Sequence, residues 1–237
     1  GKLLGGQKIS VERADSTCVD SAAATTAAEG LVANGVVAIM GADCSGVTGA
    51  IATNVAVPNG VVMISPSATS PGLTDLNDNG YFFRTAPSDA RGGQILADIT
   101  KDRKVKSVAI TYTNNDYGKG LADVYKAAVE AHGIKVTTVA AHEDGKADYS
   151  AEVATLASAG GDAVAVIGYI DQGGKGIIQA SLDSGAFDKF ILSDGMIGDS
   201  LTDNFGKALN KSFGSLPGST GKGAGVFAEV AKAGGID

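Results

Sequence analysis

Three short polar stretches in this sequence could bind a charged small molecule. Gly41–Gly46 places Ser45 ahead of a predicted helix, Ser65–Pro71 contains four hydroxyl side chains, and Ser193–Gly195 contains Asp194. Hydroxyl groups and the free amides of a helix start suit a carboxylate, whereas an aspartate suits an ammonium group. The alternative is that Ser45 caps the helix and the other hydroxyls satisfy amides within turns.

The sequence lacks the patterns of common catalytic and metal sites. It has no Gly-x-Ser-x-Gly elbow, and His132 and His142 have no metal-ligating partner at a useful spacing, so we expect both histidines at the surface. We therefore expect a protein that is not an enzyme and has no catalytic residues, no metal and no cofactor.

Composition and charge narrow the class of protein further. The chain has 237 residues, of which 44% are hydrophobic, enough for one large α/β domain or for two lobes with separate cores. The net charge of −7 argues against a nucleic-acid partner. No apolar stretch approaches the roughly 20 residues that cross a bilayer. The first residues have no basic segment before an apolar one, so we expect that any secretion signal has been removed.

Short β-branched runs alternate with longer alanine-rich segments, which is typical of βαβ units around a parallel sheet. Helices are predicted at Asp20–Asn34 and Gly118–His132, each followed by a glycine. The predicted strands are Lys8–Glu12, Val36–Met40, Val61–Ile64, Ser107–Tyr112, Lys135–Ala140, Ala163–Ile167 and Phe190–Leu192.

The two cysteines follow the first two predicted strands. In a parallel sheet, Cys18 and Cys44 would therefore lie at the same carboxyl edge. They could form a disulfide, which would stabilise the fold by about 3 kcal/mol and imply an oxidising compartment, or remain two buried thiols. Their spacing alone leaves both possibilities open.

Three motifs, in this order, resemble the leucine/isoleucine/valine-binding family of type I periplasmic binding proteins. They are Ile64–Pro71 (Ile-Ser-Pro-Ser-Ala-Thr-Ser-Pro), Phe83–Asp89 (Phe-Arg-Thr-Ala-Pro-Ser-Asp) and Asn115–Gly120 (Asn-Asp-Tyr-Gly-Lys-Gly). The resemblance extends from Glu12 to about Gly218. It implies an α/β fold of two lobes, each a parallel sheet flanked by helices.

The resemblance also implies a ligand site between the lobes. By motif position, the serine after the cysteine and the Ser-x-Thr turn of the first lobe would grip an amino acid's carboxylate and ammonium groups. Two tyrosines of the second lobe would contact the ligand, and Asp194 would hold the ammonium. The implied ligand-binding residues are Ser45, Ser67, Ala68, Thr69, Tyr117, Tyr169 and Asp194. Family members also have a cystine at positions that match Cys18 and Cys44.

The resemblance divides the chain into three parts. Residues 1–89 would form the first lobe, residues 90–210 the second, and residues 211–237 a segment that returns toward the first lobe. Relatives have one more strand between those matching Lys8–Glu12 and Val36–Met40, so we expect the first lobe to be incomplete here.

The function that this resemblance implies is transport. The expectation is a monomeric receptor, periplasmic or at the cell-envelope exterior, that delivers an aliphatic or branched-chain amino acid to the membrane permease of an ABC importer. A ligand-sensing receptor or regulator on the same fold, binding an amide or an aromatic acid, is the first alternative. An α/β enzyme is the second.

Overall fold

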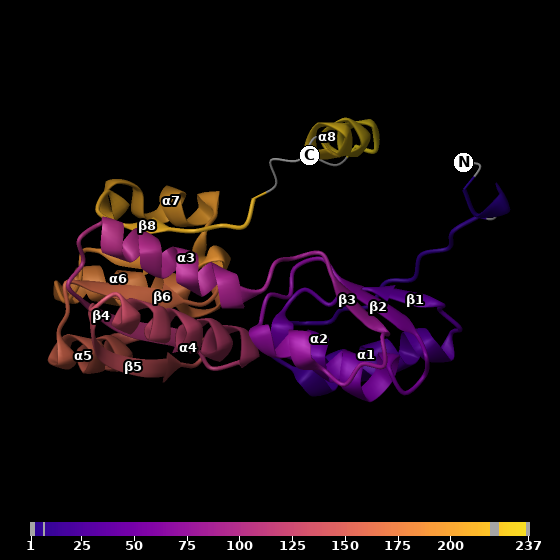
Figure 1. Ribbon diagram of the computed structural model, residues 1–237, viewed down its shortest axis with the longest axis horizontal. Helices are drawn as coiled ribbons and strands as arrows, with labels where there is room; N and C mark the ends of the chain where they lie inside the picture. The colour runs from indigo at the N-terminus through magenta and orange to yellow at the C-terminus, as the bar shows by residue number, and fades with distance from the viewer. Residues whose placement is uncertain (1–2, 7, 219–222, 236–237) are drawn as a thin grey trace.

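Two parallel sheets form the framework of the protein. The computed structural model describes residues 3–6, 8–218 and 223–235. In the first sheet the strand order is β1-β2-β3, and in the second it is β5-β4-β6-β7-β8. The two sheets with their helices lie one after the other along the long axis of the molecule (Figure 1). The two-lobed parallel α/β fold predicted from the motifs is therefore confirmed.

The first sheet is covered on one face. Helices α1 and α2 lie beneath its strands in Figure 1. The opposite face carries one residue from each strand in lateral register, Met40, Ile64 and Phe83, with exposed fractions of 88%, 41% and 52%. The elements of this lobe are α1 (Ser21–Ala33), β1 (Ala38–Met40), α2 (Ser45–Ile51), β2 (Val62–Ser65) and β3 (Phe82–Arg84).

Helices cover both faces of the second sheet. Buried residues of α3 and α4 pack on one face, and those of α5, α6 and α7 pack on the other. Because both faces are covered, its central strands are apolar throughout, and every residue of β6 is buried. The elements are α3 (Asp89–Asp102), β4 (Ser107–Thr113), α4 (Asp116–Ala131), β5 (Lys135–His142), α5 (Ser150–Ala159), β6 (Ala163–Ile167), α6 (Lys175–Ser184), β7 (Phe190–Leu192), α7 (Asp199–Phe205) and β8 (Phe213–Gly214).

One predicted strand is wrong. Lys8–Glu12 forms no strand, and its apolar residues Ile9 and Val11 are 75% and 71% exposed. A strand needs a neighbour for its backbone hydrogen bonds. Within the described residues β1 pairs with β2 alone, so no neighbour lies at its outer edge.

The limits of the two lobes and the return segment remain predictions. Predicted lobe 1–89 includes residues 1–2 and 7, and predicted segment 211–237 includes residues 219–222 and 236–237, all of which lie outside the described residues. In the described part of that segment, β8 pairs with β7 of the second sheet. None of the side chains of α8 (Gly223–Ala233) is buried.

Candidate ligand-binding site

Ser45 organises the first-lobe side of the site. It is the first residue of α2 and is 2% exposed. Its hydroxyl oxygen accepts the backbone N–H groups of Thr69 and Ser70, each over 3.1 Å. Ser45 therefore does not cap its own helix, as the alternative would require, because Cys44 is the capping residue. Since the hydroxyl oxygen accepts both amides, its hydrogen is free to donate to a carboxylate.

The turn that Ser45 holds is itself rigid. Ser65 accepts the Ala68 amide over 3.0 Å and donates to the Ala42 carbonyl over 2.6 Å. This hydroxyl therefore satisfies the turn, as the alternative interpretation predicts. Ala68 and Thr69 are buried, whereas the side chain of Ser67 is exposed. Of the predicted turn residues, the structure thus gathers Thr69 with Ser45 and leaves Ser67 at the surface.

Tyr117 and Asp194 meet on the second-lobe side. Tyr117 follows the first residue of α4, and its hydroxyl donates to Asp194 Oδ1 over 2.6 Å. The Tyr117 hydroxyl oxygen also accepts the Gly195 amide over 3.2 Å and lies 3.0 Å from Ser193 Oγ. Burial, and then the Asp194 charge, raises the pKa of the Tyr117 phenol well above its usual value. The phenol therefore stays protonated and remains a donor.

Tyr169 joins the two lobes. Its ring stacks on that of Tyr117 with centroids 5.0 Å apart and an interplanar angle of 23°. It also packs against the buried cores of both the first and the second lobe. The structure therefore brings both predicted tyrosines and Asp194 to one place, beside the first lobe.

Asp89 is a candidate site residue that the sequence reasoning missed. It begins α3 and is 5% exposed, and its Oδ2 atom has no hydrogen-bond partner among the described protein atoms. Burial raises the pKa of this carboxyl to about 7, and the charge of Asp194 adds to the shift, while a hydrogen bond from Thr69 and the Arg84 charge oppose it. Two carboxyl groups that disfavour each other's ionisation create a good position for an ammonium group. The sequence signal was the aspartate that ends the Phe83–Asp89 motif.

Two cavities adjoin these residues. A small one of about 120 Å³ is lined by Asp89 and Asp194, by Arg91, and by apolar side chains of α3, α4 and the 215–217 segment. A larger one of about 420 Å³, here called the interlobe pocket, opens between the lobes. Its lining residues are Cys18, Val19, Ser21, Gly46, Asn114, Asn115, Asp116, Glu143, Asp144, Gly145 and Gln172.

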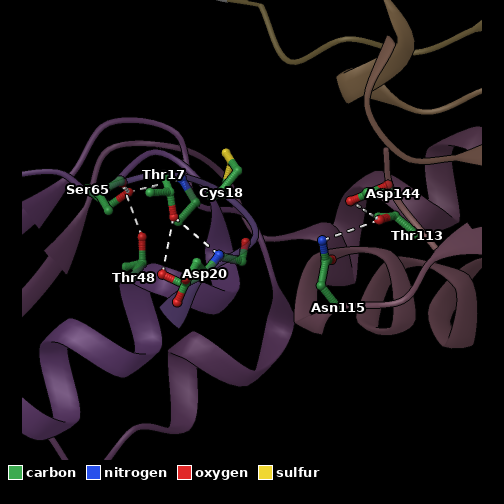
Figure 2. The surroundings of a disulfide bond; sticks show 12 residues. Thr17, Cys18, Asp20, Thr48, Ser65, Thr113, Asn115 and Asp144 are labelled. Carbon is green, nitrogen blue, oxygen red and sulfur yellow. Dashed lines mark hydrogen bonds between the residues drawn. A yellow bond between two sulfur atoms is a disulfide. The ribbon is translucent and has the colours of Figure 1, made fainter. Parts of the chain in front are cut away.

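Cys18 is part of the wall of the interlobe pocket on the first-lobe side. Cys18 and Cys44 are joined in a disulfide with a Cα–Cα distance of 5.3 Å, as the resemblance implies. Figure 2 shows Cys18 on one side, and Asn115 and Asp144 of the second lobe on the other. The disulfide therefore fixes the segment before α1 next to the start of α2, where Ser45 lies.

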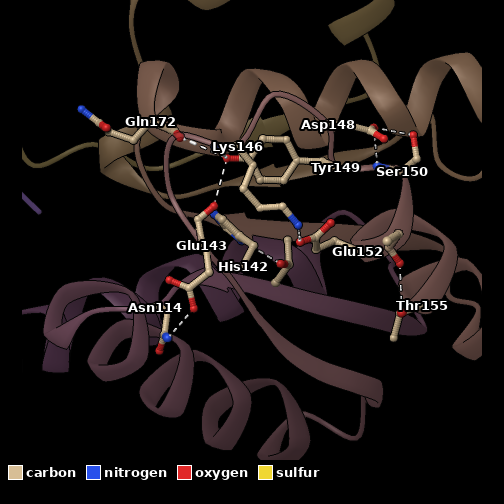
Figure 3. A network of polar contacts seen from close by, with 12 residues as sticks. Asn114, His142, Glu143, Lys146, Asp148, Tyr149, Ser150, Glu152, Thr155 and Gln172 are labelled. Atoms are coloured by element: carbon tan, nitrogen blue, oxygen red, sulfur yellow. Dashed lines mark hydrogen bonds and ion pairs between the residues drawn. The ribbon is translucent and has the colours of Figure 1, made fainter.

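A buried histidine packs among residues of the second lobe. His142 is 1% exposed, so its predicted place at the surface is wrong. Its Nδ1 lies 2.8 Å from Thr111 Oγ1. Its ring lies edge-on to the ring of Tyr149, and Figure 3 shows both residues. A Cβ added at Gly168, the residue before Tyr169, would lie 3.2 Å from His142 Nε2. Burial lowers the pKa of His142 to about 4, and the nearby Glu152 and Glu143 oppose that shift.

The residues that the structure describes contain no group of three or more His, Cys, Asp or Glu side chains arranged to hold a metal ion. None of their helices combines the length and the apolar character that crossing a membrane requires.

Comparison with known proteins identifies relatives of this chain. The Leu/Ile/Val-binding protein homolog 3 of Brucella melitensis is 39% identical over 144 residues, which are 57% of this chain and 39% of that protein. In fold, the leucine-binding protein LivK of Thermotoga maritima matches with a TM-score of 0.80 at 24% identity, over 91% of this chain and 62% of that one. The isoleucine complex of LivJ from Streptococcus pneumoniae matches with a TM-score of 0.74 at 25% identity, over the same shares.

The match to a family profile extends along almost the whole sequence. The chain spans less than two thirds of the length of these relatives. The profile described as the receptor family ligand binding region matches residues 1–227. The chain therefore belongs to this family of receptor ligand-binding regions, and its resemblance to the leucine/isoleucine/valine-binding type I periplasmic members is confirmed.

Proposed function

We propose that this chain is the ligand-binding part of an extracytoplasmic receptor that captures an amino acid, in first place a branched-chain one. The observation that carries the proposal is the meeting of two opposite kinds of group at the lobe boundary. On one side Ser45 and the start of α2 offer donors, and on the other Asp89 and Asp194 offer carboxylates. The names of the relatives, which are binding proteins for leucine, isoleucine and valine, support the choice of side chain.

A zwitterion fits this arrangement because each end of it finds an opposite charge or dipole. The Ser45 hydroxyl and the amides at the start of α2 would hold the carboxylate. Asp89, Asp194 and the Thr69 hydroxyl would surround the ammonium. An unpaired charge in a closed site costs several kcal/mol, so a ligand that lacks the amino group would leave the two acids without compensation. Tyr117 would keep Asp194 oriented.

Transport would follow from closure of the two lobes. In this proposal, residues 1–89 and 90–210 act as lobes that move relative to each other, and residues 211–237 return to the first lobe. A ligand that contacts both lobes favours the closed form, which a membrane permease of an ABC importer would recognise. The disulfide fits an oxidising compartment outside the cytoplasm. The receptor would work as a monomer.

A panel of the twenty amino acids, small carboxylates and amides, assayed by thermal unfolding and titration calorimetry, tests the proposal. A ligand at about 100 times its dissociation constant stabilises the folded state by about 2.7 kcal/mol. Stabilisation by leucine, isoleucine or valine, lost in Asp194→Ala but kept in the control Asp203→Ala on α7, would support it. Stabilisation by carboxylates that lack an amino group, with none by amino acids, would contradict it.

A further inference from the structure

The interlobe pocket is lined by neighbours of residues in the proposed zwitterion site. Its lining residue Gly46 follows Ser45, and its lining residue Asp116 precedes Tyr117. Asn115, which also lines the pocket, is hydrogen-bonded to the Tyr169 hydroxyl. A ligand whose charged groups lie between Ser45 and Asp194 would therefore have this cavity next to it. Its volume of about 420 Å³ falls within the range of roughly 300–1,000 Å³ typical of small-molecule pockets.

The lining of the pocket is polar and negatively charged. Three carboxylates, three amides and one serine line it, and none of its described lining residues is Lys or Arg. The nearby Lys146 is paired with Glu152, and Lys119 is paired with Asp123 over 2.6 Å. An aliphatic side chain in this pocket would remove water from the acids without replacing their hydrogen bonds, which is unfavourable.

Asp144 is the acid in the pocket that burial affects most. Its Oδ2 atom accepts a hydrogen bond from Thr113 over 2.6 Å, while its buried Oδ1 atom has no partner among the described protein atoms. Burial raises the pKa of this carboxyl, which means that its charge is poorly solvated. A cationic group of a ligand beside this carboxylate, which lines the pocket, would supply a compensating charge.

The other two acids contribute less to selectivity. Asp116 and Glu143 are exposed, so water and salt screen their charges, and exposed ion pairs contribute about 0–1 kcal/mol each. Glu143 also accepts a hydrogen bond from Asn114 over 2.7 Å. Discrimination between a charged and a neutral side chain must therefore come mainly from Asp144.

We infer that the interlobe pocket gives this receptor a second class of ligand, amino acids with a cationic side chain, and that Asp144 determines this specificity. The inference rests on the proposed amino-acid site, because the backbone of the ligand must be held there while its side chain enters the pocket.

Matched ligand pairs test the inference by titration calorimetry on the whole chain. Arginine is compared with citrulline, and lysine with norleucine, since each pair has nearly the same shape and differs in side-chain charge. We expect the charged member to bind at least about tenfold more tightly, and the difference to shrink at high salt. In Asp144→Asn the difference should fall to about twofold or less. In Glu143→Gln it should fall only slightly, and in the control Asp203→Asn it should not change.

The outcomes separate this inference from the proposed function. Because each ratio is measured within one variant, a loss of folded protein in Asp144→Asn does not affect it. Binding of leucine together with equal affinities for arginine and citrulline overturns the cationic class and leaves the amino-acid receptor intact. A preference for arginine that is unchanged in Asp144→Asn overturns the role of Asp144. If no amino acid binds at all, the proposed function itself fails.

Discussion

The Tyr117 hydroxyl donates to Asp194 Oδ1 over 2.6 Å, and the two residues are separated by 77 positions in the sequence. The bond connects the start of α4 with the loop after β7. Parallel strands bring these segments together because both follow the carboxyl ends of strands in one sheet. Asp194 is thereby oriented before any ligand arrives, which lowers the entropic cost of binding.

Replacing Tyr117 by phenylalanine tests this orientation. Tyr117→Phe should weaken amino-acid binding by about tenfold, because Asp194 loses a donor and gains freedom to rotate. Tyr125→Phe is the matched control, since Tyr125 is equally buried and its hydroxyl lies 2.9 Å from Thr100 Oγ1, away from the site. Both variants should lose about 1 kcal/mol of unfolding free energy. Calorimetry that finds equal affinity in Tyr117→Phe and in the wild type would contradict the role of this bond.

Ionisation of the Asp89 carboxyl should lower the free energy of unfolding as the pH rises. Its folded-state pKa of about 7 lies above the ordinary value of 3.8, so its contribution to stability is full below the unfolded pKa and is lost as the pH rises through 7. Asp89→Asn cannot ionise and should be more stable than the wild type at about pH 8, on the order of a few kcal/mol, while it binds amino acids more weakly. Urea unfolding at several pH values measures this difference. Equal pH profiles for the two proteins would show that the carboxyl titrates normally.

His142 should have the opposite effect on the pH dependence of stability. Its folded-state pKa of about 4 lies below the ordinary 6.5, so its contribution is full above 6.5 and is lost as the pH falls toward 4. His142→Gln should flatten the loss of unfolding free energy over that window. His132→Gln is the control, because His132 is partly exposed and its Nε2 lies 2.7 Å from Asp98 Oδ1. If the acid-induced loss of unfolding free energy persists in His142→Gln, other groups cause that loss.

The local sequence pattern was sufficient to predict strands that are buried along their whole length. The ranges predicted for β6 and β7 agree with the structure because both strands are buried on both faces and read as unbroken apolar runs. Lys8–Glu12 alternates polar residues with the apolar Ile9 and Val11, a pattern typical of a half-buried strand, yet it forms no strand. The sequence pattern of one segment does not show whether a neighbouring strand is present to pair with its backbone.

The site residues were predictable to different extents for a similar reason. Tyr117 and Asp194 were found through motif position, and their contact confirms that they lie together. Asp89 looked like an ordinary acid in the first turn of a helix, where the helix dipole favours one. Its raised pKa comes from burial and from the charge of Asp194, which is distant in sequence. His142 was placed at the surface because of its polar neighbours, whereas Tyr149 and Gly168 enclose it.

The contact between the lobes gives the last prediction. A Cβ added at Gly120 of α4 would lie 2.9 Å from Pro71 Cδ and 3.2 Å from Ser70 Oγ, and Ser70 donates to the Asp116 carbonyl over 3.1 Å. Gly120→Ala should therefore separate the turn from α4, break that hydrogen bond and weaken ligand binding by about tenfold.

The matched control lies within the first lobe. At Gly49 a Cβ would meet Leu73 Cδ2 at an ordinary 3.5 Å, so Gly49→Ala should bind ligand normally and be stabilised by about 0.4–1 kcal/mol. Small-angle scattering would compare the dimensions of the two variants, and calorimetry would compare their affinities. If Gly120→Ala binds as tightly as Gly49→Ala, the approach of Gly120 to Pro71 does not control the relative position of the lobes during binding.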